Sequence, residues 1–162
     1  MDPDAARFSY DTVAATYATK FFDELSRKPF DRELLELFAD QCPGGRILDI
    51  GCGPGHIGRF LALYSLIHIK RADVPGALAE FKRVLMPEAR LLVAVHGGTG
   101  EITSADFLGH QARFAATLFE KSELVRLVAD AGFHVERAAE RERYEFETHT
   151  PRIYVAATVG LG

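Results

Sequence analysis

The sequence has few of the residues that mark stapled, metal-bound or membrane proteins. Its two cysteines, Cys42 and Cys52, suggest neither a disulfide framework nor a zinc site, and no metal is expected. No apolar run is long enough to cross a membrane, and no signal peptide opens the chain. The formal net charge of −4 argues against a general nucleic-acid binder, which would carry a basic face. We therefore expect a cytoplasmic protein with reduced thiols that binds neither membrane nor nucleic acid.

The first half of the chain predicts helices followed by a buried strand. Residues 2–28 are polar with interleaved aromatic residues and indicate one or two short helices. Asp31 can cap a helix that carries Leu34, Leu35 and Phe38 on one face. Residues 46–50 form an apolar segment typical of a buried strand that leads into a glycine loop. The apolar run 63–69 is too short for periodicity to distinguish helix from strand.

The second half alternates predicted helices and strands. Asp73 is the expected N-cap of a helix that Pro87 ends, and residues 91–95 form a strand buried on both faces. Residues 97–100 form a glycine-rich loop, and residues 106–119 look helical. Ser122 is the expected cap of a further helix, with Gly132 after its end. Strands at 133–141 and 152–159 complete an α/β plan with a mainly parallel sheet.

The glycine loop after the first strand is the best-defined motif. It reads Asp49-Ile50-Gly51-Cys52-Gly53-Pro54-Gly55. Glycines let the backbone approach a ligand closely and adopt positive φ, and the following helix start offers unpaired N–H donors. His56 stands where a dinucleotide-binding loop would have its third glycine, and no Gly-Lys-Ser/Thr follows, so a phosphate-binding P-loop is excluded. An acid at 49 with three glycines fits the methionine part of S-adenosylmethionine.

Several segments together resemble class I S-adenosylmethionine-dependent methyltransferases of the small-molecule type. Tyr10-Asp11-Thr12-Val13-Ala14 through Tyr17 is similar to the family's N-terminal lid, and Leu48 to Gly55 is similar to its first motif. Tyr64 to Ile69 resembles the stretch after the fourth strand, which lines the reacting methyl. The segments 80–94 and 124–135 resemble the fifth and last helix–strand units. The resemblance implies a single domain, with a helical lid over residues 1–45 and a Rossmann-like three-layer core over residues 46–162.

Two departures from the family pattern stand out. The usual Pro-Gly-Gly turn is Pro87-Glu88-Ala89, which should reshape the turn because non-glycine residues resist positive φ. After Ala62 the chain passes almost directly to Leu63, without room for the next two strands and most of the fourth, since each βαβ unit takes roughly 30 residues. We therefore expect a mostly parallel sheet reduced by the loss of strands after the first βα unit.

The apparent deletion has two consequences. It would leave residues 46–50 as an exposed apolar edge, which predicts a homodimer or a swapped assembly. The acid that normally binds the ribose hydroxyls would also be lost. Asp73 stands about 20 residues beyond Gly51, near the spacing for a ribose carboxylate, although capping the next helix is the favoured interpretation.

The resemblance assigns candidate roles to single residues. His68 is the candidate catalytic base, because it lies on the segment expected over the methyl group and its ordinary pKa near 6.5 suits that work; a packed or surface histidine is the alternative. His96 follows a strand and faces the usual ligand crevice. The expected cofactor-binding residues are Asp49, Gly51, Cys52, Gly53, Gly55, Tyr10, Tyr17 and Tyr64.

The remaining polar residues have simpler interpretations. His110, His134 and His149 are expected to be structural or exposed, and Glu140 to Arg143 are expected to form a solvated strand face. Two functions stay open. The first is an active methyltransferase that uses S-adenosylmethionine on a small molecule. The second is a catalytically inactive relative that binds a ligand or partner after losing its ribose and adenine contacts.

Overall fold

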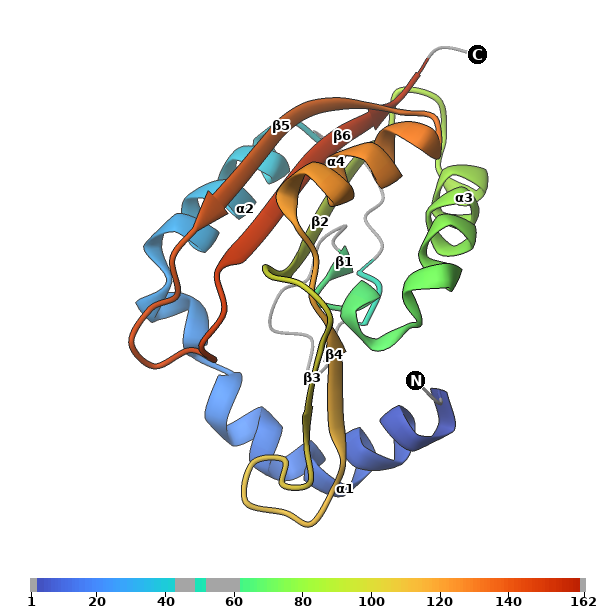
Figure 1. The fold of residues 1–162 in the computed structure, drawn as a ribbon. Coiled ribbons are helices and arrows are strands. Elements are labelled where there is room, and N and C mark those ends of the chain that lie inside the picture. Colours follow the sequence, from blue (N-terminus) through green and yellow to red (C-terminus); the bar gives the residue numbers. More distant parts are fainter. Residues whose placement is uncertain (1–2, 43–48, 52–61, 161–162) are drawn as a thin grey trace.

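A four-stranded sheet forms the centre of the molecule (Figure 1). The computed structural model describes residues 3–42, 49–51 and 62–160. The strands are β1 (Ala62–Leu63), β2 (Arg90–His96), β5 (Phe133–Arg141) and β6 (Arg152–Val159), in the order β1-β2-β6-β5. Only β1 and β2 pair in parallel, while β6 runs antiparallel to both β2 and β5. The predicted mostly parallel sheet is therefore not confirmed by the described residues, because the last two strands are joined directly without a crossover helix.

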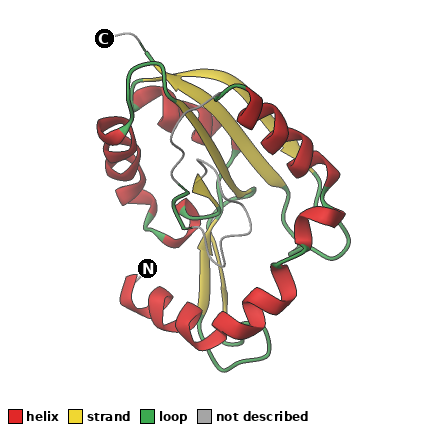
Figure 2. Ribbon diagram, turned by 180° about the vertical axis from the view of Figure 1, so that it is seen from behind, coloured by secondary structure: helices red, strands yellow, loops and turns green. Residues whose placement is uncertain are grey.

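Helices cover both faces of this sheet, as Figures 1 and 2 show from opposite sides. Strand β2 is buried on both faces: Leu91, Val93 and Val95 join one hydrophobic core, and Leu92 and Ala94 join the other. Helices α3 (Val74–Val84) and α4 (Lys121–Asp130) cover the first face, and α2 (Pro29–Asp40) covers the second. The predicted layering of helix, sheet and helix is confirmed.

Of the three predicted N-cap residues, only Asp73 lies at the N-cap of its helix. Asp73 occupies the N-cap of α3 but makes no side-chain capping bond. Helix α2 begins at Pro29, so Asp31 lies inside its first turn, where it is buried and bonded to the sheet rather than capping the helix. Helix α4 begins at Lys121, so Ser122 is not its cap. Gly132 follows the end of α4 with φ +86°, as predicted.

The segment 106–119 is not helical. It contains a turn in which Leu108 and Gly109 have φ of +57° and +83°, and then strand β4 (Phe114–Thr117). Two consecutive residues with positive φ cannot continue a right-handed helix. Strand β4 pairs with β3 (Glu101–Ser104) in an antiparallel ribbon, and Thr117 Oγ1 donates to the Ile69 carbonyl at 3.2 Å. Tertiary pairing overrides the local helical tendency of this alanine-containing segment.

The N-terminal segment is helical, as predicted. Helix α1 spans Pro3–Phe21 and is followed by the 3-10 helix η1 (Glu24–Arg27). Figure 1 shows α1 lying across the end of the β3–β4 ribbon, away from the C-terminus. Two bonds fix it there: Ser9 Oγ donates to the Arg113 carbonyl at 2.7 Å, and Thr16 Oγ1 lies 2.9 Å from His110 Nε2. His110 thus has a structural contact, as expected.

No helix in the described ranges is long and apolar enough to cross a membrane.

Two ambiguous segments take definite forms. The run after Ala62 forms the short strand β1 and then the 3-10 helix η2 (Leu66–His68), with Tyr64 between them at φ +58°. The departure from Pro-Gly-Gly strains the turn after α3 and does not reshape it, since Glu88 adopts the positive φ of +62° that a glycine would take there. A left-handed conformation at a residue with a Cβ costs about 1–2 kcal/mol.

Candidate functional site

A cleft of about 470 Å³ opens beyond the carboxyl ends of strands β1 and β2. Tyr64 follows β1 and His96 ends β2, and their ring centroids lie 5.2 Å apart. The opposite wall comes from α1 and from the loop between β3 and β4, which contribute Tyr10, Tyr17 and Phe107. Ligands of open α/β sheets bind in the crevice outside the carboxyl ends of the strands, so this cleft is the expected place for a substrate.

Tyr10 is the centre of the aromatic wall. Its ring centroid lies 5.6 Å from Tyr17, 5.2 Å from His68 and 5.2 Å from Phe107, each pair in an edge-to-face arrangement. Burial, with a smaller contribution from Glu24, raises the pKa of Tyr17 to about 12. Burial also raises the pKa of Tyr10. Both phenols therefore remain protonated at neutral pH.

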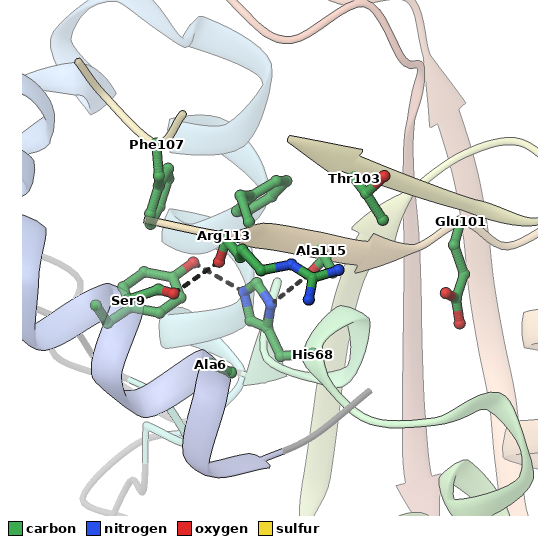
Figure 3. A pocket seen from close by; sticks show the side chains of 10 residues that line it. Ala6, Ser9, His68, Glu101, Thr103, Phe107, Arg113 and Ala115 are labelled. Carbon is green, nitrogen blue, oxygen red and sulfur yellow. Dashed lines mark hydrogen bonds between the residues drawn. The ribbon is translucent and has the colours of Figure 1, made fainter. Parts of the chain in front are cut away.

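His68 lies in a neighbouring cavity of about 210 Å³, shown in Figure 3. Figure 3 places Ser9 of α1 on one side of this cavity and Thr103 of β3 on the other. His68 Nδ1 lies 3.2 Å from the Ala115 carbonyl, and His68 Nε2 lies 2.8 Å from Tyr10 Oη. Because a carbonyl can only accept, Nδ1 carries the proton and Nε2 accepts the Tyr10 hydroxyl. Burial lowers the pKa of His68, which favours this neutral form.

The position of His68 changes its predicted role. His68 lines the smaller cavity, whereas Tyr10 lines both cavities. A ligand in the larger cleft would therefore contact Tyr10, and any effect of His68 on that ligand would pass through the hydrogen bond between them.

His96 is a polar wall of the cleft rather than a base. Its Nδ1 lies 2.9 Å from Thr150 Oγ1, and its side chain is buried. Burial, helped by the positive charge of Arg152, lowers the pKa of His96 to about 3. The imidazole is thus neutral throughout the physiological range.

A buried ionic network closes the sheet end of the cleft. Glu147, with a side chain only 3% exposed, lies 2.7 Å from Arg141, 3.1 Å from Lys28 and 3.6 Å from Arg152. Burial alone would raise the pKa of Glu147. The hydrogen bonds from Arg141 and from the Tyr144 N–H outweigh this effect and lower the pKa of Glu147 to about 2. Glu24 pairs with Lys28 and Asp31 pairs with Arg141, so the network contains three carboxylates for three cations. It holds the 142–150 loop against the sheet.

This network corrects the interpretation of residues 140–143 as a solvated face. Glu140 and Glu142 are exposed, but the Arg141 side chain is only 10% exposed. Its guanidinium lies 2.7 Å from Asp31, and Tyr154 Oη donates to the same carboxylate at 2.6 Å. Sequence reasoning missed these partners because they come from α2, β5 and β6, and no local spacing connects them.

The described part of the glycine loop lies against Ser65, the residue after Tyr64. Gly51 has φ +82°, and a Cβ at this position would lie 3.0 Å from the Cβ of Ser65. Asp49 is half-buried, and Ile50 packs against the core. Ser65 Oγ is buried and has no hydrogen-bond partner among the described residues, so it is a functional candidate that the sequence did not indicate. Cys52, Gly53 and Gly55 lie outside the described residues.

The structural comparison decides the fold. A crystal structure of an S-adenosylmethionine-dependent methyltransferase from Methanosarcina mazei matches with a TM-score of 0.55 at 18% identity, over 63% of this chain and 58% of that chain. The chain shares the methyltransferase fold. In this methyltransferase fold the described strands and helices place Tyr10, Tyr17, Tyr64 and His96 around one cleft, with His68 behind Tyr10.

Sequence comparison adds a likeness that covers only part of each chain. No family model matches the chain. Over 85 residues it is 33% identical to the probable tRNA methyltransferase 9B of Mus musculus, and the human protein of the same name matches equally. The match covers 51% of this chain but only 18% of those relatives. In the described part of the chain, no group of three or more His, Cys, Asp or Glu side chains could hold a metal ion.

Proposed function

We propose that this protein is an S-adenosylmethionine-dependent methyltransferase that acts on a small molecule. The observation that carries the proposal is the close approach of Gly51 to Ser65, the residue that follows the cleft-lining Tyr64. A backbone turn that leaves no room for a Cβ, next to a buried hydroxyl without a partner among the described residues, fits a polar ligand tail such as the methionine part of the cofactor. Asp49, Gly51, Cys52, Gly53 and Gly55 would hold that tail, with Tyr64 beside them.

The protein's own residues would position the acceptor and remove its proton. When bound, the cofactor supplies a methyl group on a sulfonium, so alignment of the acceptor provides much of the rate. Tyr10 and Tyr17 would close the cleft over the reactants, as the lid resemblance implies. His68 would serve as general base through Tyr10, because its Nε2 accepts the Tyr10 hydroxyl.

Calorimetric titration with S-adenosylhomocysteine tests cofactor binding. We expect micromolar affinity for the wild-type chain and at least about a tenfold loss in Gly51→Ala, whose new methyl group would collide with Ser65. Gly100→Ala is the matched control, since Gly100 also has a positive φ of +75° but faces open space. Absence of binding by folded wild-type protein would overturn the proposal and favour the inactive ligand- or partner-binding alternative.

Ser65→Ala gives a second variant with less risk to folding. It removes the hydroxyl without adding atoms. Loss of one hydrogen bond to the ligand is worth about 0.5–1.5 kcal/mol, or roughly a two- to twelvefold weaker affinity. Unchanged affinity would mean that Ser65 does not contact the cofactor.

The acceptor has a second candidate class. The name of the mouse and human relatives supports tRNA, although the shared region is only 18% of their length. Transfer of tritiated methyl groups to total tRNA, measured beside transfer to a small-molecule extract, separates the two classes. The acidic net charge favours the small molecule.

A further inference from the structure

Aromatic side chains dominate the larger cleft. Seven tyrosine and phenylalanine side chains line it. They come from α1, from the residue before η2, from the β3–β4 ribbon and its loop, and from the 142–150 loop: Tyr10, Tyr17, Phe21, Tyr64, Phe107, Phe114 and Phe146. The ring centroids of Phe107 and Phe114 lie 4.9 Å apart and those of Tyr17 and Phe21 lie 4.6 Å apart, both pairs with tilted planes. Such a lining offers ring faces and edges to a flat ligand from several directions.

The charges of the cleft do not call for a strongly charged ligand. At its sheet end Lys28 pairs with Glu24 at 2.9 Å and with Glu147 at 3.1 Å, and Arg152 lies 3.6 Å from Glu147. Two further cations of the lining lie over aromatic rings, Lys20 over Phe21 and Arg27 over Phe146, and Asp106 adds a carboxylate. His96 is uncharged at neutral pH because its pKa is lowered to about 3 by burial. The lining thus carries charges of both signs, four cations and three carboxylates, beside its seven aromatic rings.

One polar atom at the aromatic wall is prepared to accept a hydrogen bond. The Tyr10 hydroxyl proton is directed to His68 Nε2, because His68 Nδ1 already donates to the Ala115 carbonyl. The lone pairs of Tyr10 Oη are then the groups it can offer to a ligand. They would be satisfied by an O–H or N–H donor.

We infer, building on the proposed function, that the methyl acceptor is a planar aromatic compound with an O–H or N–H group, held among these rings and bonded to Tyr10 Oη. In the transfer the acceptor oxygen or nitrogen forms a bond to the methyl carbon as the methyl–sulfur bond breaks. The acceptor proton moves to Tyr10 Oη, and the proton of Tyr10 moves to His68 Nε2. The positive charge of the sulfonium thus ends on the imidazolium of His68.

Three related probes test the ring and the donor separately: 2-naphthol, 2-methoxynaphthalene, which lacks the donor, and decahydro-2-naphthol, which lacks the flat rings. Affinities are measured by NMR titration of the full chain, first alone and then with S-adenosylhomocysteine. We expect 2-naphthol to bind at least about fivefold more tightly than its saturated analogue, the discrimination that one stacked ring provides. We expect it to bind about two- to tenfold more tightly than the methoxy compound, as one hydrogen bond allows.

Variants assign each preference to its residue. Tyr10→Phe should abolish the preference for 2-naphthol over 2-methoxynaphthalene while leaving ring recognition in place. Phe107→Leu should weaken both naphthalenes by at least about fivefold. Phe8→Leu is the matched control, because Phe8 lies on the same helix as Tyr10 but is 69% exposed and outside the cleft.

The outcomes separate this inference from the proposed function. Equal affinity for 2-naphthol and its saturated analogue would overturn the inference, as would a donor preference that survives Tyr10→Phe. Ring preference without S-adenosylhomocysteine binding would support the ring site and overturn methyl transfer. S-adenosylhomocysteine binding without ring preference would overturn the aromatic acceptor alone.

Discussion

Replacing Glu147 by glutamine removes the negative charge at the centre of the buried ionic network while keeping the size of the side chain. In the native structure its carboxylate is within 4 Å of three cations, Lys28, Arg141 and Arg152. It also accepts the Tyr144 N–H at 2.8 Å, which anchors the loop that follows β5. The amide of glutamine can keep one of these bonds but cannot balance the charges.

The expected cost follows from burial. Removing one partner of a buried ion pair costs about 3–5 kcal/mol, because the remaining charges lie in a medium that solvates them poorly. Lys28, Arg141 and Arg152 are all nearly enclosed, with side chains 8%, 10% and 4% exposed. Domains of this kind are stable by about 5–15 kcal/mol in total, so Glu147→Gln should remove a large share of the stability.

Urea unfolding followed by circular dichroism measures this change. Glu145→Gln, two residues earlier in the same loop and exposed, is the control and should stay within about 0.5 kcal/mol of wild type. Arg141→Gln combined with Glu147→Gln should cost less than the sum of the single changes, because the double variant removes one charge of each sign. A loss below about 1 kcal/mol for Glu147→Gln would refute the view that this network is a dry, charge-balanced unit.

Further predictions concern acid stability, a strained turn, a helix start and self-association. The free energy of unfolding should fall below pH 6.5, because His96 is neutral when folded but takes up a proton when unfolded. Glu147 should add to this loss between its unfolded pKa near 4.5 and its folded pKa of about 2. Urea unfolding measured over a pH series should show that His96→Asn reduces the pH dependence in the upper part of this range, where one group contributes at most about 1.4 kcal/mol per pH unit. Glu88→Gly should raise the thermal midpoint, with a gain of about 0.5–1 kcal/mol, since glycine accepts the φ of +62° without strain. Asp73→Ala should leave S-adenosylhomocysteine affinity unchanged, and a large loss in calorimetry would instead support a ribose contact. Sedimentation should detect a dimer at low micromolar concentration, and a monomer there would count against an exposed edge at residues 46–50.

The sequence could predict elements whose signals are local. The last two strands begin and end as expected, because Gly132 precedes the first and a turn precedes Arg152 at the start of the second. The burial of β2 on both faces was predictable from its unbroken apolar run. The segment 106–119 was not, because its strand exists only through pairing with β3, which no periodicity within the segment reveals.

The same difference between local and non-local signals decides which residues of the candidate site could be predicted. Tyr10, Tyr64 and His68 were found because the family resemblance carries them, and the fold brings them around adjoining cavities. The ionic network was missed because Asp31 and Arg141 are 110 positions apart, and Arg141 stands in a run of alternating charge that looks solvated. The hydroxyl of Ser65 was missed because only its burial beside Gly51 distinguishes it from any other serine.

The predicted deletion would act on the two halves of the site differently. The walls of the aromatic cleft come from α1, the ends of β1 and β2 and the β3–β4 ribbon, which are held by a core that α3, α4 and β6 complete. The cofactor side would lose more, because the resemblance places the family's ribose and adenine contacts on the strands that the predicted deletion would remove. A chain that has lost those strands should therefore keep its ring-binding cleft more readily than its cofactor affinity. For this reason the naphthol titrations without cofactor test the aromatic cleft by itself. S-adenosylhomocysteine binding tests whether the glycine loop and Ser65 suffice for cofactor affinity without the predicted missing ribose and adenine contacts.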